Sequence, residues 1–409
     1  MSAPVTSPLE AFEALATSAG RRDPYPGYEA IRAHGNLVRL KPGRLVAVGH
    51  AECARALREP KLLVQDGDSY DITFPSWRTH SSLRAFTSSM LYSNPPAHHR
   101  LRGLVNGAFT PPKVAQLRSV IEDMVDRLVD HVADAGAGGS PVDLIAEFAA
   151  RLPIAVISTM LGFPERDQVW FRDIASTVAE STDGFTDPAA LARADAAMDE
   201  LSAYFADLLD QRRRAPADDL VTMLAQVHDA GDGRLSHDEL MGNLMVLLTA
   251  GFETTSFLIG HGVLLALDDQ RHAHRLRTEP DFAAGYVEEI LRFEPPVHIT
   301  SRWAATDVDL VGTPVPAGTK LVLVLAAGNR DPRRYVEPDT FDPDRRNSQP
   351  LSFGAGGHFC LGAPLARLEA RIALPTLLRR FPRLAIGGPI QYRHRLVVRG
   401  LDALPITIG

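Results

Sequence analysis

Residues 351–367 read LSFGAGGHFCLGAPLAR, and this stretch decides how the rest of the chain is interpreted. A glycine-rich loop leads to Cys360, and a run with apolar residues at helical spacing follows from Pro364 to Arg379. A thiolate just before a helix N-terminus is stabilised by the backbone N–H groups and by the positive end of the helix dipole. The small residues let a large flat group approach the sulfur. From these residues alone, the sulfur serves either a cofactor metal or a substrate carbonyl.

The composition is that of an ordinary globular chain, with 409 residues, 45% hydrophobic and 23% charged. Its net charge of −7 argues against nucleic acid as a partner, because phosphate binding requires a basic face. Two cysteines argue against a disulfide framework and fit a reducing cytoplasm. The N-terminus has no cationic start and no apolar core of signal-peptide length. The most apolar run, 240–267, contains Asn243, Glu253 and His261, which predicts a buried helix and no membrane span.

The hydrophobic pattern predicts a mainly α-helical protein with small β-sheets, whose strands lie at about 20–60 and 300–409. Helices are expected at 28–33, 51–57, 97–109, 112–133, 142–161, 218–228, 237–267, 283–293 and 364–379, with two or three more between 163 and 215. Strands are expected in a hairpin at 38–48, at 308–310 and 320–325, and in a final sheet of 396–399 and 405–408. Residues 1–20 are expected to be a loose arm. Cys53 has no metal-ligand spacing to other residues and is interpreted as a packed core residue.

Residues 65–90 are polar, aromatic and irregular, with no clear period. A stretch this long without its own secondary structure is usually functional. Its aromatic residues Phe74, Trp77 and Phe86 could line a ligand cavity. A surface loop without such a role explains the pattern equally well.

The predicted central helix contains AGFETT at residues 250–255, which breaks the rules for a helix interior. Glycine there costs roughly 1 kcal/mol relative to alanine, and burying the acid Glu253 costs more. Thr254 and Thr255 can bond back to carbonyls one turn earlier and bend the helix. One interpretation is a groove for a small ligand, in which a hydroxyl and a carboxylate pass protons into a dry cavity. The alternative is a packing notch where another helix crosses.

Several motifs together resemble the bacterial cytochrome P-450 family of haem-thiolate monooxygenases, over nearly the whole chain. FGAGGHFCLG at 353–362 resembles the haem-binding loop, and residues 250–255 resemble the oxygen-activation motif. Glu289-x-x-Arg292 resembles the helix pair of the family, and FDPDR at 341–345 carries the arginine, Arg345, that completes this triad. NRDP at 329–332 and the helix with His98 and Arg102 also stand in the order of the family.

The resemblance implies a haem b cofactor, held between the long central helix and the helix after the cysteine loop, with Cys360 as the thiolate ligand of the iron. The haem propionates are anionic and need cations, for which arginine is well suited because it can bind a carboxylate with two bonds. The implied propionate partners are His98, Arg102, Arg302 and His358, and the other implied haem contacts are Phe353, Gly354, Ala250 and Gly251. Thr254 is implied to stabilise dioxygen and Glu253 to relay protons. Glu289, Arg292 and Arg345 are assigned to structure.

The implied activity is that of a monooxygenase, built as one domain over residues 1–409. One atom of O2 enters a hydrophobic small molecule by hydroxylation or epoxidation, and a macrolide, a polyketide or another secondary metabolite is favoured as the substrate. Because the chain has no G-x-G-x-x-G dinucleotide fingerprint, the electrons are expected from a separate ferredoxin and its ferredoxin reductase, in the cytoplasm. The alternative keeps the fold and catalyses oxidative coupling, or has a haem role without oxygenation.

A largely apolar substrate cavity is expected, with a few polar handles. Its lining is assigned to residues 177–185 and to Phe74, Trp77, Phe86, Leu244, Leu248, Phe252, Val297, His298, Ile299, Leu396 and Val397. Phe252 and His298 are the expected selectivity elements. A cysteine acyl-transfer enzyme, with His358 as base and Cys360 as nucleophile, is the rival interpretation. It leaves Glu289 and Arg292 unexplained.

Overall fold

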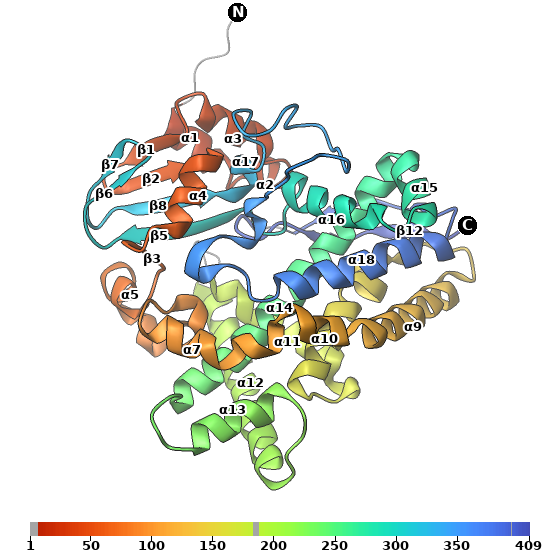
Figure 1. The fold of residues 1–409 in the computed structure, drawn as a ribbon, viewed down its shortest axis with the longest axis horizontal. Coiled ribbons are helices and arrows are strands. Elements are labelled where there is room, and N and C mark those ends of the chain that lie inside the picture. Colours follow the sequence, from red (N-terminus) through yellow and green to blue (C-terminus); the bar gives the residue numbers. More distant parts are fainter. Residues whose placement is uncertain (1–6, 183–187, 394) are drawn as a thin grey trace, which may run out of the picture. The chain divides into compact units, whose positions relative to one another are not determined.

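The computed structural model describes residues 7–182, 188–393 and 395–409. The chain divides into two units (Figure 1). Unit 1 consists of Met1–Val64, Gly260–Cys360 and Pro389–Leu404, and unit 2 consists of Gln65–Ile259, Leu361–Gly388 and Pro405–Gly409. Most described residues are helical, as the sequence predicts, and the strands are short.

The centre of unit 1 is a five-stranded sheet with the strand order β1-β2-β8-β5-β3 (Figure 1). Its strands are β1 (Leu37–Lys41), β2 (Arg44–Ala47), β3 (Leu62–Leu63), β5 (Ile299–Ala304) and β8 (Lys320–Val324). β2 and β8 are parallel and the other neighbours are antiparallel. The predicted hairpin is confirmed, with Gly43 at a φ of 71° in its turn.

Both faces of this sheet are buried, because successive side chains of a strand point to opposite faces. On one face, Leu321 and Leu323 pack with helix α4 (His50–Arg58). On the other face, Val322 and Val324 pack with helix α3 (Tyr25–Arg32).

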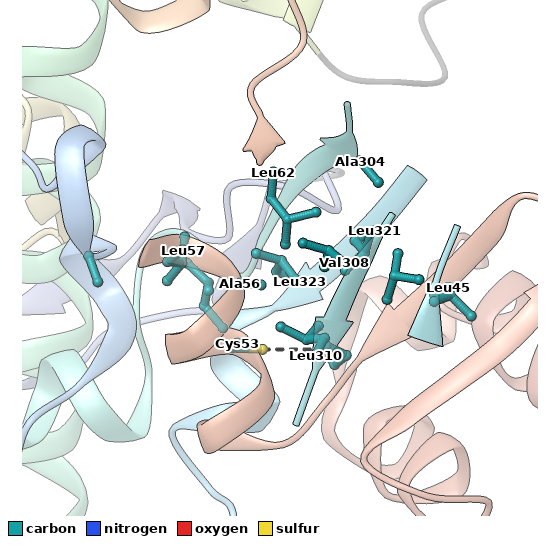
Figure 2. Close-up of a cluster of buried hydrophobic side chains, with 14 of the residues drawn as sticks. Leu45, Cys53, Ala56, Leu57, Leu62, Ala304, Val308, Leu310, Leu321 and Leu323 are labelled. Atoms are coloured by element: carbon teal, nitrogen blue, oxygen red, sulfur yellow. Dashed lines mark hydrogen bonds between the residues drawn. The ribbon is translucent and has the colours of Figure 1, made fainter. Parts of the chain in front are cut away.

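Cys53 of α4 lies inside the first of these clusters, as Figure 2 shows. Its Sγ is 3.5 Å from the carbonyl oxygen of Ala47. Burial raises the pKa of the Cys53 thiol far above its usual range. The prediction of a core cysteine is confirmed, and Cys53 remains a protonated thiol at neutral pH.

Unit 1 also contains further helices, hairpins and 3-10 turns. They are α1 (Pro8–Ala14), α2 (Ser18–Arg22), α15 (Gln270–Thr278), α16 (Phe282–Phe293), α17 (Leu325–Gly328), the hairpins β6 (Val308–Leu310) with β7 (Thr313–Val315) and β10 (Gln391–Tyr392) with β11 (Leu401–Ala403), and the 3-10 turns Leu351–Phe353 and Gly356–His358. The prediction of a loose arm at residues 1–20 is wrong for the described residues, because Ser7 and Glu10 form a capping box at α1 and Phe12 is buried. Residues 1–6 of that expected arm lie outside the described part of the chain.

Unit 2 is built mainly of helices. They are α5 (Gly67–Thr73), α6 (Ser81–Thr87), α7 (Ala97–Val105), α8 (Pro111–Gln116), α9 (Arg118–Gly136), α10 (Arg151–Leu161), α11 (Gln168–Ala179), α12 (Pro188–Arg214), α13 (Leu220–Asp229) and α18 (Ala363–Arg380). The strands β4 (Val142–Asp143), β9 (Ala385–Ile386) and β12 (Pro405–Thr407) form a small sheet. α18 and α9 run side by side in this unit (Figure 1).

Helix α14 (His237–Asp268) begins in unit 2 and continues into unit 1. A capping box lies at its start, because Ser236 N donates to Glu239 Oε2 at 2.9 Å and Glu239 N donates to Ser236 Oγ at 3.3 Å. Among the described helices, only α14 is long and apolar enough to cross a membrane by length and composition. Of the most apolar 18-residue stretch of α14, 67% is buried inside the protein, as expected for the core helix that the sequence predicts.

Four expectations for secondary structure are corrected. Residues 65–90 are not irregular but contain α5, α6 and two 3-10 turns, which are too short to show a helical period. The helix expected at 112–133 is divided at Leu117 into α8 and α9, and the run at 142–161 becomes helical only after β4. Residues 396–399 form no strand of a final sheet, because their main-chain bonds go to residues 296–299 through the bridge Val297–Val398.

Candidate active site

The loop before α18 presents Cys360 on a tightly turned backbone in unit 1. Cys360 N donates to the carbonyl oxygen of Phe353 at 2.8 Å, which closes the loop. Gly354 and Gly356 have φ values of 68° and 70°, a region that favours glycine. A Cβ on Gly356 would lie 2.6 Å from the carbonyl oxygen of Leu57, so this glycine is required by packing against α4. Phe353, Gly354, His358 and Cys360 therefore share one loop whose shape the backbone fixes.

Asn329 holds the start of this loop, a role that the sequence did not reveal. Leu351 N donates to Asn329 Oδ1 at 2.7 Å, and Asn329 Nδ2 donates to Ser352 Oγ at 2.9 Å and to the Leu291 carbonyl oxygen at 3.2 Å. Asn329 is fully buried. In the sequence, Asn329 stood out only as part of the NRDP motif at 329–332, which did not predict the hydrogen bonds of its side-chain amide.

Glu289, Arg292 and Arg345 meet in unit 1. Arg292 donates to both carboxylate oxygens of Glu289, at 2.9 and 2.7 Å, and Arg345 Nε donates to Glu289 Oε1 at 3.2 Å. Arg292 also donates to the carbonyl oxygen of Asn329 at 3.1 Å. Because Arg292 and Glu289 are both buried, removing either partner would leave an unpaired buried charge. This ion pair is connected through Asn329 to the cysteine loop.

Arg302 of β5 is a buried cation without a carboxylate. Its side chain donates to the Ser301 carbonyl oxygen at 2.8 Å and to Thr300 Oγ1 at 3.5 Å. No carboxylate in the described residues forms an ion pair with it, and burial lowers the pKa of Arg302 to about 10. Buried charges normally have a partner, so an anion from outside the chain would complete this site. A haem propionate fits that requirement.

His98 and Arg102 lie one turn apart on α7 in unit 2 and share a face. His98 is buried, and Arg102 is half-buried. Burial, followed by the charge of Arg102, lowers the pKa of His98 to about 4. At neutral pH the imidazole of His98 is therefore uncharged, so Arg102 supplies the positive charge and His98 can supply one N–H donor to an anionic group.

The AGFETT segment of α14 contains the packing notch that the sequence allowed, and the ligand groove stays a prediction. A Cβ on Gly251 would lie 3.1 Å from Ile157 Cγ1 of α10, so this glycine serves as a packing notch. Glu253 is buried, and its Oε1 accepts a hydrogen bond from Ser176 Oγ of α11 at 3.3 Å. Thr254 Oγ1 donates to the Ala250 carbonyl oxygen at 3.2 Å, the expected back-bond. Ser176 was missed, because nothing in the sequence brings α11 to Glu253.

The residues assigned to a substrate cavity differ in burial. In unit 2, Leu244, Leu248, Phe252, Trp77 and Phe86 are buried, and Phe74 is partly exposed. In unit 1, Val297, Leu396 and Val397 are half-buried, and Ile299 and His298 are buried. Residues 183–185 of the expected lining segment 177–185 lie outside the described residues.

The fold and the cysteine loop define a haem-thiolate class of protein, and comparison with known families makes this specific. The family model described as "Cytochrome P450" matches residues 32–386, and the chain belongs to this family. It is 40% identical to "Cytochrome P450 monooxygenase PikC" of Streptomyces venezuelae, over 94% of this chain and 91% of that protein. It is 36% identical to "6-deoxyerythronolide B hydroxylase" of Saccharopolyspora erythraea, over 89% of this chain and 90% of that protein.

A solved structure agrees with these relatives. Ligand-free CYP164A2 of Mycobacterium smegmatis superposes with a TM-score of 0.86 at 36% identity, covering 98% of this chain and all of that chain. The protein is therefore a cytochrome P450 monooxygenase, an oxidoreductase. Its family binds haem b through a cysteine thiolate and uses O2 as the co-substrate.

Proposed function

We propose that this protein hydroxylates or epoxidises a large hydrophobic metabolite of the macrolide or polyketide type. The observation that carries the oxygenase chemistry is the pairing, on one turn of α14, of the buried Glu253 with Thr254. The name of the Saccharopolyspora erythraea relative, a hydroxylase of 6-deoxyerythronolide B, supports the substrate class.

Cys360 is the proposed ligand of the haem iron. The chain has two cysteines, and Cys53 is excluded by its burial and its raised pKa. Arg302, His98, Arg102 and His358 are the proposed partners of the propionates. Phe353, Gly354, Ala250 and Gly251 are the proposed contacts of the ring. The haem, when bound, supplies reductive activation of O2.

Glu253 and Thr254 are the proposed catalytic residues. Glu253 accepts a hydrogen bond from the Ser176 hydroxyl at its Oε1 and is proposed to relay protons, and Thr254 is proposed to present a hydroxyl to the reacting oxygen. In a dry cavity, such groups direct protons to one place and exclude bulk water. Glu289, Arg292 and Arg345 are assigned to structure, because their hydrogen bonds are to one another and to backbone groups.

The proposed substrate contacts are mainly apolar side chains. They are Phe74, Trp77, Phe86, Leu244, Leu248, Phe252, Val297, His298, Ile299, Leu396 and Val397. A separate ferredoxin and ferredoxin reductase are the proposed electron donors, the cytoplasm is the proposed location, and residues 1–409 are proposed to act as one domain.

The test begins with the purified, haem-loaded protein. Reduction under carbon monoxide should give the shifted Soret band of a thiolate-ligated haem. Cys360→Ser should abolish this band, and the matched variant Cys53→Ala should keep it. Loss of the band in Cys53→Ala but not in Cys360→Ser would contradict the assignment.

The substrate class is tested with a panel of macrolide aglycones and linear polyketides, and terpenoids serve as comparison. A low-to-high-spin shift should single out macrocycles, and 18O2 should label the product with one oxygen atom. A spin shift without labelled product would favour oxidative coupling or a haem role without oxygenation. Thr254→Ala should consume electrons without a matching yield of product.

A further inference from the structure

A largely buried polar cluster lies at the end of α16. It consists of Tyr28, Glu294, His298, Arg330 and Arg399, all in unit 1, and is called the Glu294 cluster here. Arg399 Nε donates to Glu294 Oε1 at 2.5 Å, and Arg330 lies 3.6 Å from Glu294 Oε2. His298 Nε2 lies 3.9 Å from Glu294 Oε1, and the Tyr28 hydroxyl is 2.9 Å from His298 Nδ1. Glu294 is thus surrounded by basic side chains.

Arg399 joins distant parts of the chain. Its guanidinium donates to the carbonyl oxygens of Arg21 at 2.7 Å and Arg22 at 2.9 Å, in addition to Glu294. Its backbone N donates to the Pro296 carbonyl oxygen at 2.8 Å. Because the planar guanidinium has donors in fixed directions, this residue determines where the backbone around it lies.

The segment around Val397 is otherwise held by packing and by a few main-chain bonds, and Leu396 packs against the cluster that contains Val322 and Val324. His298 N donates to the Val397 carbonyl oxygen at 2.9 Å, and Val297 and Val398 form a single β-bridge. No longer ladder holds the described residues 395–399. The side-chain anchor at Glu294 therefore adds to this support, between β10 and β11, where no ladder fixes the register.

We propose that Glu294 is a positioning residue for substrate selectivity, which acts through Arg399 and His298 on the apolar wall formed by Val297, Leu396 and Val397. This inference rests on the proposed function, which assigns these three side chains to the substrate cavity. Glu294 does not touch the substrate.

The electrostatics of the cluster agree with this role. Burial alone would raise the pKa of Glu294, but the charge of Arg399, followed by His261, His298 and Arg330, lowers the pKa to about 2. The carboxylate is therefore ionised at every working pH. Glu294→Gln keeps the shape of the side chain and leaves Arg399 without its counter-charge.

The test measures the binding of two azoles to the holoenzymes by the shift of the Soret band. Imidazole reports access to the iron, and econazole, a bulky arylimidazole, also contacts the wall of the cavity. In Glu294→Gln the Kd of econazole should rise about tenfold, while the Kd of imidazole should change less than about twofold. Tyr28→Phe, which removes only the hydroxyl next to His298, should give a smaller change in the same direction.

Glu279→Gln is the matched control, because Glu279 pairs with Arg275 at 3.0 Å on the exposed surface of the same unit. It should keep the wild-type ratio of the two Kd values. If Glu294→Gln and Tyr28→Phe both keep the wild-type ratio of the two Kd values, the inference is overturned. If Glu294→Gln does not bind haem, Tyr28→Phe decides, and an unchanged ratio again overturns it. If neither azole shifts the Soret band of the wild-type protein, the proposed function is overturned, and this inference is overturned with it.

Discussion

Three buried or partly buried charged side chains show how the chain satisfies a charge in its interior. Arg292 has Glu289, and Glu294 has Arg399, each at hydrogen-bonding distance. Among the described residues, Arg302 donates to neutral oxygens only, those of Thr300 and Ser301. Since isolated buried charges are costly, the first two pairs are complete within the chain, and Arg302 is the one suited to an anionic cofactor.

Two buried histidines should make the stability of the protein depend on pH. Burial lowers the pKa of His298 to about 3 and that of His261 to about 4. Their side chains bind protons near pH 6.5 in the unfolded chain, so their contribution is complete above pH 6.5 and is lost as the pH falls toward the folded values. The free energy of unfolding should fall by about 2 kcal/mol per histidine between pH 6.5 and pH 5.

Urea denaturation at several pH values measures this dependence. His298→Gln should remove about half of the effect that the two histidines produce. The control is His274→Gln, because His274 is exposed, and it should keep the wild-type dependence. An identical pH dependence in His298→Gln and wild type would contradict the prediction.

At the scale of the elements, helix caps separate what is local from what is not. Ser7 caps α1 and Ser236 caps α14 through residues three positions away. The N-terminus of α6 is capped by Asp195 of α12, which accepts from Ser82 N at 3.0 Å, from Ser82 Oγ at 2.6 Å and from His80 Nδ1 at 2.6 Å. The helical structure of residues 81–87 therefore depends on a residue far along the chain.

Asp195→Ala should destabilise α6 selectively. Loss of a helix cap costs about 1 kcal/mol, and the two side-chain partners, His80 and Ser82, lose their acceptor as well. Hydrogen exchange at residues 81–87 should accelerate at least about fivefold, whereas exchange in α9 should stay unchanged. Asp199→Ala, an exposed position on the same helix, is the control, and equal exchange in both variants would contradict the role of Asp195.

At the scale of the molecule, one arginine connects several segments of unit 1. Arg292 donates to Glu289 and to the carbonyl oxygens of Asn329, Pro338 and Thr340. Asn329 in turn holds Leu351 at the start of the cysteine loop. The geometry of that loop therefore depends on a residue that is not part of it.

Arg292→Lys should lower the fraction of protein that forms a thiolate-ligated haem. A lysine keeps the charge but cannot make these divergent bonds, and the expected loss of stability is about 3 kcal/mol or more. The carbon monoxide difference spectrum per mole of protein, together with Tm, measures both effects. Arg334→Lys, at an exposed arginine of the same unit, should behave as wild type, and wild-type haem content in Arg292→Lys would contradict the prediction.

The sequence by itself determined the family, the predominance of helices, the hairpin of β1 and β2, the capping box of α14 and the core position of Cys53. These features depend on residues within a few positions of one another, so period, caps and turn residues express them directly. The short helices between 65 and 90 were not recognised, because α5 and α6 are each too short to show a helical period.

Only the tertiary structure decided which distant side chains meet. It brought Asp195 to α6, Asn329 to Leu351, Gly356 to Leu57 and Arg399 to Glu294. The physical reason is that a polar group in the interior takes whichever partner the packing brings within hydrogen-bond distance. The cysteine loop therefore indicates the haem cofactor from the sequence alone, through its resemblance to the haem-binding loop of the family. Only the fold shows which residues hold this loop and the expected cavity wall.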